Sequence, residues 1–302
     1  MTKVVAISTK RVMTSTQKKL IQYLLLEVLD SARLTEDGAG KVILGGSQLQ
    51  EQLVRVLHSY SRDQKFSHEQ TKSKCRYPIS FEGICPIEQQ ILVLSELFNL
   101  DPESAMRYAM EELPQLKLPE GAEDWVAIPR FQNFSQGEDD LDDVYTTALI
   151  RVYDELGARC PFTSNKNMVF SSIFQNERKK APIAAITMRQ SGEILILPAQ
   201  LGQRYRGMSN RRAEALFEEG EFALGLFEVL CIALTSPSLF APSQHQSHLP
   251  LCVSCPGDLY VYGYEKENPC PLIQDYRDKW RVVNRNGGQY DLNVGVATGF
   301  VV

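Results

Sequence analysis

The chain has 302 residues, of which 43% are apolar and 23% are charged. This is ordinary globular usage, and it excludes a disordered chain or a long coiled coil while leaving room for two domains. The net charge of −5 is uneven: residues 1–76 carry +6 (thirteen Lys and Arg against seven Asp and Glu) and residues 77–302 carry −11 (nineteen against thirty), which fits either a basic segment facing an anionic partner or solvated surface helices.

The first residues, MTKVVAISTKRVMTSTQKK, lack the apolar core of a signal peptide. The longest apolar stretch, residues 222–234, has thirteen residues and includes Glu228. A membrane-spanning helix needs roughly 20 apolar residues. The seven cysteines, without an export signal, are typical of reduced thiols. We therefore expect a cytoplasmic protein that does not enter a membrane.

Helical periodicity dominates the first third of the chain. Apolar residues recur three and four positions apart in residues 15–34 and again in residues 47–60. The stretch EDGAGKVILGG between them, residues 36–46, predicts a turn, a short apolar run and a second turn. Two more helices are predicted at residues 86–100 and 101–113.

A linker is predicted at residues 114–123, PQLKLPEGAE, because it contains two prolines and a glycine. We therefore predict a helical N-terminal domain at residues 1–113 and a second domain at residues 124–302. In the second domain, the apolar runs at 183–197 predict a central hairpin, and Asn286-Gly287 predicts another.

Further strands and helices are predicted within residues 124–302. The predicted strands are 124–131, 167–174, 249–254 and 258–264, and the predicted helices are 141–158, 209–219 and 221–234. Hairpins imply antiparallel pairing, so the expected fold class is α+β: a helical N-terminal region followed by a mixed, largely antiparallel sheet with packed helices.

The segment HQSHLPLCVSC, residues 245–255, resembles a pair of zinc half-sites. His245 and His248 form one pair, and Cys252 and Cys255 form the other. Only three residues separate the pairs, which is too few for two turns to converge on one metal. We therefore expect a metal-free loop leading into a strand that buries Cys252, and we expect no cofactor. The alternative is that one pair joins a distant ligand such as Cys270.

The same segment offers a catalytic alternative. Cys255 precedes the turn PGD, where its thiol would be exposed, with His248 as a base and Asp258 as the group that orients it. This arrangement would give a Cys/His-dependent hydrolase or transferase. The competing interpretation is an ordinary buried cysteine, since cysteine is among the most buried residue types.

Glu228 stands out because the helix around it is otherwise apolar. A catalytic carboxylate is one interpretation. The alternatives are a solvent-facing seam of the helix or a partner for an arginine.

The stretch QLGQRYRGMSNRRAEALF, residues 200–217, is the candidate ligand site. Its expected ligand-binding residues are Arg204, Tyr205, Arg206, Ser209, Arg211 and Arg212. Ser209 is a natural N-cap, which places two arginines in a first helical turn, where the helix dipole disfavours cations. An anion at the helix start would reverse that cost, with arginine donors adding bidentate hydrogen bonds. The alternative is that the arginines pair with acids nearby in the chain, such as Glu214, Glu218 or Glu219, or with acidic surface residues elsewhere in the protein.

Three functional hypotheses follow. The first is a protein that binds an anionic ligand, either nucleic acid or a phosphorylated small molecule, through the arginine cluster. The second is the Cys/His-dependent hydrolase or transferase. The third is a non-catalytic protein–protein interaction factor with an unidentified protein partner.

Overall fold

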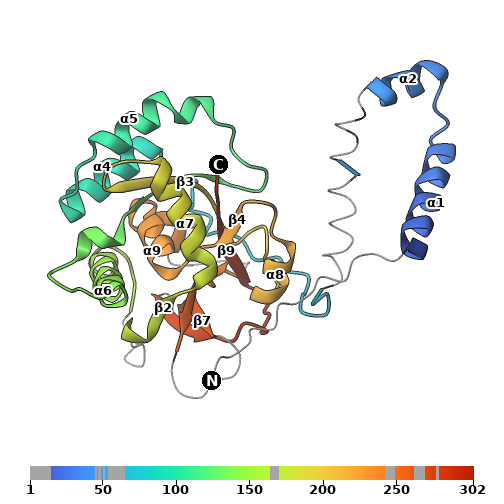
Figure 1. The fold of residues 1–302 in the computed structure, drawn as a ribbon. Helices are drawn as coiled ribbons and strands as arrows, with labels where there is room; N and C mark the ends of the chain where they lie inside the picture. Colours follow the sequence, from blue (N-terminus) through green and yellow to red (C-terminus); the bar gives the residue numbers. More distant parts are fainter. Residues whose placement is uncertain are drawn as a thin grey trace, which may run out of the picture. The chain divides into compact units, whose positions relative to one another are not determined.

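The computed structural model describes residues 15–44, 65–163, 170–241, 249–261, 269–276 and 279–302, with single positions at 46, 49, 52 and 53. The chain forms two compact units, Met1–Ser61 and Arg62–Val302 (Figure 1).

The smaller unit contains two described helices, drawn in blue in Figure 1. Helix α1 spans Ser15–Ser31, as predicted. Helix α2 spans Glu36–Leu44, so the turn expected there is wrong. The side-chain oxygen of Thr35 accepts a hydrogen bond from the backbone N–H of Gly38 at 3.2 Å, and this cap starts a helix despite two glycines. The helix predicted at 47–60 lies largely outside the described residues.

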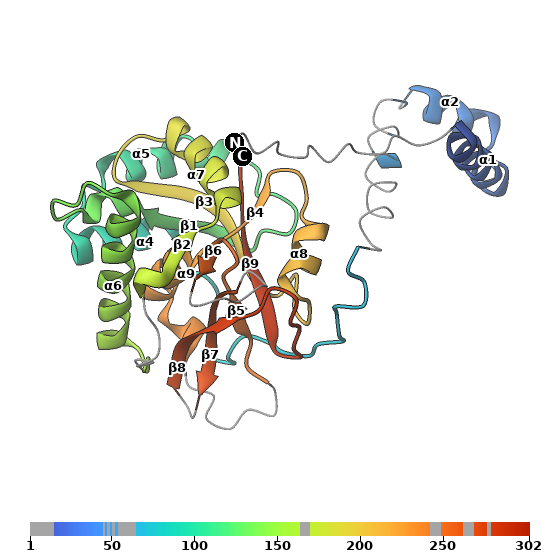
Figure 2. The same cartoon turned by 60° about the horizontal axis from the view of Figure 1, so that its bottom comes forward.

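The larger unit is built on a seven-stranded sheet with the order β1-β3-β9-β5-β7-β8, and β4 also pairs with β9. The strands are β1 (Asp124–Pro129), β3 (Ile194–Leu201), β4 (Glu221–Ala223), β5 (Cys252–Ser254), β7 (Cys270–Tyr276), β8 (Lys279–Arg285) and β9 (Val294–Phe300). Only β5 and β9 pair in parallel. Figure 2 shows β9 in the middle of this unit.

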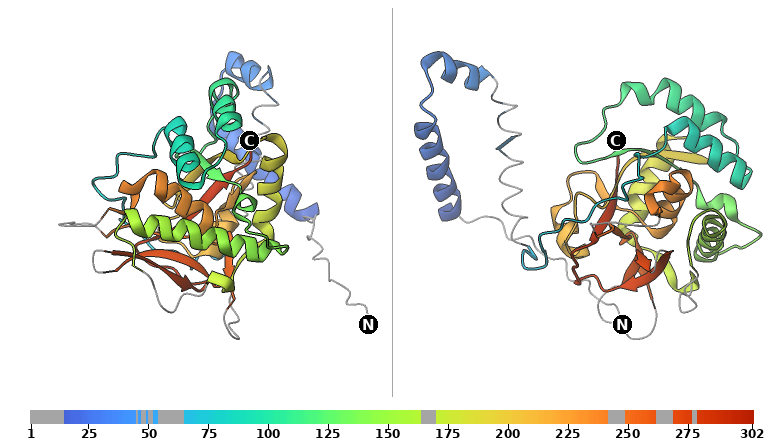
Figure 3. Two further views of the ribbon diagram at one scale, coloured as in Figure 1. Left: turned by 90° about the vertical axis from the view of Figure 1, so that its left-hand side faces the viewer. Right: turned by 180° about the vertical axis from the view of Figure 1, so that it is seen from behind.

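A second sheet pairs β2 (Ile173–Gln175) with β6 (Asp258–Tyr260). The helices of the larger unit are α4 (Ile87–Phe98), α5 (Glu103–Glu111), α6 (Leu141–Arg159), α7 (Glu177–Arg189), α8 (Asn210–Leu216) and α9 (Leu226–Thr235). The two views of Figure 3 show α9 enclosed between α6 and α4. The predicted α+β class is confirmed.

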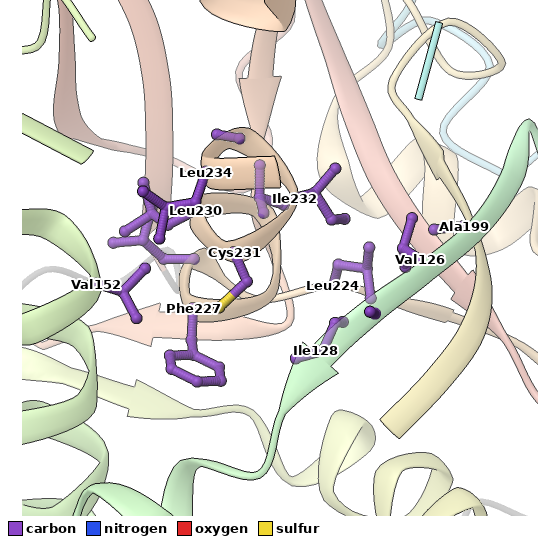
Figure 4. Packing of buried hydrophobic residues seen from close by; sticks show 14 of the residues in the cluster. Val126, Ile128, Val152, Ala199, Leu224, Phe227, Leu230, Cys231, Ile232 and Leu234 are labelled. Carbon is purple, nitrogen blue, oxygen red and sulfur yellow. The ribbon is translucent and has the colours of Figure 1, made fainter. Parts of the chain in front are cut away.

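Helix α9 is the centre of the hydrophobic core. All ten of its residues are buried, which places it between helices and the sheet rather than at the surface. Phe227, Leu230 and Cys231 pack with Val126 and Ile128 of β1 in one cluster (Figure 4). The strand β4 precedes α9, so the helix predicted at 221–234 begins only at Leu226.

Helices α4 and α5 belong to the same core as the sheet. Ile91, Leu94 and Phe98 are buried with strand β1 in one cluster. The division of the chain lies between Ser61 and Arg62, so the expected linker at 114–123 is inside the larger unit. The apolar faces of both helices need a covering surface, and β1 and β3 supply it.

The hairpin predicted at 183–197 is wrong. Residues 177–189 form helix α7, and the chain then enters β3, whose eight residues are all buried. The side chain of Asn176 accepts a hydrogen bond from the N–H of Arg178 at 3.1 Å and caps the helix. Apolar runs without alternation fit a buried helix and a buried strand equally well, and here the cap decides between them.

The hairpin predicted at Asn286-Gly287 is also wrong. Strand β8 pairs with β7, the strand before it, and not with β9. After Arg285 the chain crosses to β9, which lies between β3 and β5. The described residues include no helix that is both long enough and apolar enough to span a bilayer.

Gly295 and Gly157 provide a matched test of this packing. A Cβ at Gly295 would overlap the backbone of Gly202, whereas a Cβ at Gly157 in α6 would meet nothing within 4 Å. We expect Gly295→Ala to lower the free energy of unfolding by about 2 kcal/mol. We expect Gly157→Ala to raise it by about 0.5–1 kcal/mol, because alanine favours helix.

Urea denaturation of both variants beside the wild type measures the two changes. An unchanged stability of Gly295→Ala would contradict the close approach of β9 to the turn after β3.

Candidate functional site

A cavity of about 700 Å³ lies in the larger unit. Its walls come from the start of α7, from α8, from β4, from the turn at 256–257 and the strand β6 that follows it, and from residues 65–66 and 287–288. Helices α7 and α8 and strand β4 are labelled in Figures 1 and 2. Clefts that bind small molecules are typically about 300–1,000 Å³, so the cavity has room for a ligand of nucleotide size.

Lys179, which lines the cavity, belongs to a buried cluster of four polar side chains. Lys179 of α7 donates hydrogen bonds to Asp258 Oδ1 at 2.8 Å, to Glu228 Oε2 at 3.0 Å and to Tyr145 Oη at 3.0 Å. The side chains of Lys179 and Asp258 have no exposed surface. Four elements, α6, α7, α9 and β6, therefore meet at one ammonium group.

The two carboxylates of this cluster are also held by the backbone. Asp258 Oδ2 accepts from the hydroxyl of Tyr145 at 2.7 Å and from the N–H of Leu226 at 2.6 Å. Glu228 Oε2 accepts from the N–H of Gly225 at 2.8 Å and so caps α9. Buried charges are tolerated when their hydrogen bonds are satisfied in this way.

The pKa shifts in the cluster define the state of its lysine. Burial alone would lower the pKa of Lys179, but the charges of Asp258 and Glu228 outweigh burial and raise it. Burial raises the pKa of Glu228, against the opposing charge of Lys179. Lys179 is therefore a protonated ammonium whose donors are occupied, which suits it to holding four elements together and not to nucleophilic attack.

The predicted N-cap at Ser209 is confirmed, since its side chain accepts a hydrogen bond from the N–H of Arg212 at 3.0 Å. The charge opposite Arg211, one of the two first-turn arginines, belongs to the protein itself. Arg211 contacts both carboxylate oxygens of Glu69, at 2.7 and 2.5 Å, and Ser209 donates to the same carboxylate at 2.6 Å. Burial would raise the pKa of Glu69, but its bonds to Arg211 and Ser209 lower it. Glu69 thus takes the position expected for an external anion.

The other predicted ligand-binding residues have structural partners. Arg212 is buried and donates to Gln70 at 3.2 Å and to the carbonyl of Lys65 at 2.9 Å. Arg204 lies 3.5 Å from Glu218 and 3.8 Å from Glu221.

Tyr205 and Arg206 complete the predicted set. Tyr205 is buried and donates to Glu221 at 2.8 Å, so its ring does not offer a free stacking surface. The exposed Arg206 donates to Gln203 at 2.9 Å. Of the six predicted residues, Arg211 is the one that lines this cavity.

The expectations for residues 245–255 have mixed outcomes. His245 and His248 lie outside the described residues. Cys252 is buried in β5, as predicted. Among the residues that the structure describes, no three His, Cys, Asp or Glu side chains gather as metal ligands do.

The catalytic alternative needed an exposed thiol at Cys255, and the structure instead shows the buried cysteine of the competing interpretation. Cys255 has no exposed surface, and burial raises the pKa of its thiol far above the ordinary value, which disfavours the nucleophilic thiolate. Its backbone N–H bonds to the carbonyl of Pro271 at 2.9 Å, so the following turn packs inward against β7. Asp258 is occupied by Lys179, Tyr145 and the backbone, and not by a described histidine.

Of the six described charged residues that line the cavity, the sequence prediction placed only Arg211 in the ligand site. Lys65, Arg178 and Glu214 line the cavity, and Arg178 forms an ion pair with Glu214. Glu228 gave a signal as an acid within an apolar helix, but its partner is Lys179 rather than an arginine. The sequence NERKKAPI gives no sign that Lys179 is buried and that its neighbours are exposed.

Comparisons of this chain with protein-family models, with curated proteins and with solved structures find no match.

Replacing Lys179 tests the buried cluster. In Lys179→Met, the carboxylates lose their cation, and we expect a loss of about 3–5 kcal/mol in stability at pH 8. The deficit should shrink towards pH 5. Burial holds the pKa of Glu228 above its unfolded value, and a carboxyl with a raised folded pKa penalises folding less as the pH falls and it takes up a proton.

Lys180→Met is the matched control for this change. Lys180 is the next residue and is 44% exposed, and its one ion-pair partner among the described residues is the exposed Glu177, so its loss should cost less than about 0.5 kcal/mol. Urea denaturation at pH 5 and pH 8 measures both variants. Equal losses for the two lysines would contradict the central role of Lys179.

Proposed function

We propose that the protein binds a small molecule with an anionic group in this cavity. The observation that carries the proposal is the convergence of three cations from separate segments: Lys65, Arg178 at the start of α7 and Arg211 at the start of α8 all line one cavity. Cations placed on a concave surface attract phosphate and carboxylate groups.

The two arginines retain contact with solvent. The side chain of Arg178 is 77% exposed and that of Arg211 is 47% exposed. A guanidinium group has five N–H donors arranged as a fork that matches phosphate and carboxylate oxygens. The described hydrogen bond of Arg178 to Glu214 uses one of its terminal nitrogens, so an incoming anion can compete for this side chain.

The apolar part of the cavity supports a ligand with a ring or hydrocarbon portion. Phe66, Phe217 and Phe222 line it beside the cations. This mixture, together with a volume of about 700 Å³, favours a phosphorylated small molecule over a nucleic-acid strand. A strand needs a basic groove along its backbone, whereas residues 77–302 carry a net charge of −11.

We further propose that the protein works in the cytoplasm. All seven cysteines are free, which fits a reducing compartment. The hydrolase alternative gains no support from Cys255, because its thiol is buried and its pKa is raised.

Thermal unfolding with and without 10 mM inorganic phosphate, or with adenosine monophosphate, tests the binding proposal. We expect both probes to raise the Tm of the wild type, because a ligand that binds only the folded state stabilises it. Arg178→Ala and Arg211→Ala should each weaken binding by about tenfold or more, since a hydrogen bond to a charged group contributes about 1.5–3 kcal/mol.

Arg206→Ala is the control, because Arg206 is exposed, belongs to the same arginine-rich segment and does not line the cavity. It should respond to the probes as the wild type does. A loss of response in Arg206→Ala alone, or no response in the wild type, would contradict the proposal.

A further inference from the structure

The charges of the cavity cations are balanced by the protein's own carboxylates. Lys179 bonds to Asp258 and Glu228, Arg211 bonds to Glu69, and Arg178 bonds to Glu214. An anionic ligand that takes the paired donors of these three cations therefore competes with a carboxylate that already holds one of them.

Three of these carboxylates are fixed in place. Asp258 and Glu228 are buried and accept hydrogen bonds from backbone N–H groups. The side chain of Glu69 is 3% exposed, and both Ser209 and Arg211 bond to it. Displacing any of them would leave a buried charge without its partners, at a cost of several kcal/mol.

Glu221, which also lines the cavity, is fixed in the same way. Its side chain has no exposed surface. One of its oxygens accepts from Tyr205 at 2.8 Å and from the N–H of Glu218 at 3.0 Å, and the other accepts from Thr298 at 2.7 Å. Displacing the carboxylate of Glu221 would break all three of these hydrogen bonds.

Glu214 differs from the other four carboxylates. Its side chain is 23% exposed, and its one described hydrogen-bond partner is Arg178, which is itself 77% exposed. The charge of Lys65 also acts on Glu214. Two of the three cations assigned to the ligand thus face a single carboxylate that, within the described part of the chain, no backbone group holds.

We propose that Glu214 is an internal competitor for the anion site, so that a ligand binds by replacing its carboxylate on Arg178 and Lys65. This inference rests on the proposed function and adds its regulation. The Arg178–Glu214 pair joins α7 to α8 across the cavity, and it must open as the ligand's anionic group takes the guanidinium. Loss of the negative charge on Glu214 therefore favours binding.

The exchange predicts a pH dependence. Burial raises the pKa of Glu214, against the opposing charges of Arg178 and Lys65, so acidification neutralises this carboxylate earlier than an ordinary glutamate. Anion affinity should then rise as the pH falls. The other charged groups that face Glu214 or the cavity are Lys65, Arg178, Lys179, Arg211 and Glu221. His68 lies 3.5 Å from Glu69, the carboxylate that holds Arg211.

The test compares Glu214→Gln with Glu218→Gln by isothermal titration calorimetry. The probes are sulfate, which does not itself titrate between pH 5 and pH 8, and adenosine monophosphate. Glu218 is the matched control because it is a nearby acid that pairs with Arg204 and does not line the cavity. Thermal unfolding without ligand checks that both variants are folded.

We expect Glu214→Gln to bind both probes at least about tenfold more tightly than the wild type at pH 7.5, and to lose most of the gain in sulfate affinity between pH 7.5 and pH 5.5. Glu218→Gln should match the wild type in both respects. If the wild type binds and Glu214→Gln binds equally or more weakly, the exchange is wrong while the binding proposal stands.

Equal tightening in both variants would also overturn the exchange, because it would reflect overall charge alone. Absence of binding by the wild type and by Glu214→Gln would contradict the proposed function itself, and the exchange with it.

Discussion

The buried ammonium group of Lys179 is the interaction on which the larger unit depends. A lone charge at this depth would cost several kcal/mol, so the fold must supply partners from every direction. Asp258, Glu228 and Tyr145 provide them from three different elements. The same two carboxylates that bind Lys179 also hold α9, the helix at the centre of the core. Glu228 caps this helix, and Asp258 accepts a hydrogen bond from its first backbone N–H.

The same constraint orients the charged wall of the cavity. Successive residues of an α-helix point about 100° apart, so burying Lys179 against α9 turns Arg178 out of the core and towards α8. There it meets Glu214. A separate ion pair with Glu69 fixes Arg211 at the start of α8. The cavity therefore combines rigid ion pairs, which hold its walls, with one ion pair, Arg178–Glu214, that is exposed enough for a ligand anion to replace its carboxylate.

The sequence predicted the α+β class, α6, the N-cap at Ser209 and the burial of Cys252, because each depends on local pattern. It failed where the outcome depends on distant contacts. The apolar runs at 183–197 did not reveal that Asn176 caps a helix. The arginines left open whether an external anion or an internal acid lies at the start of α8, and only the fold shows that Arg211 pairs with Glu69, which is 142 positions earlier in the chain. Lys179 and Arg178 looked equivalent in sequence, and only packing makes one buried and the other exposed.

The most direct test of this account is to locate an anion in crystals grown with tungstate, whose anomalous scattering identifies it. We predict a tungstate ion in the cavity within about 3 Å of the Arg178 guanidinium, with the carboxylate of Glu214 turned away from Arg178. Tungstate bound only at Arg204 or Arg206, with the Arg178–Glu214 pair intact and the cavity free of the ion, would contradict it.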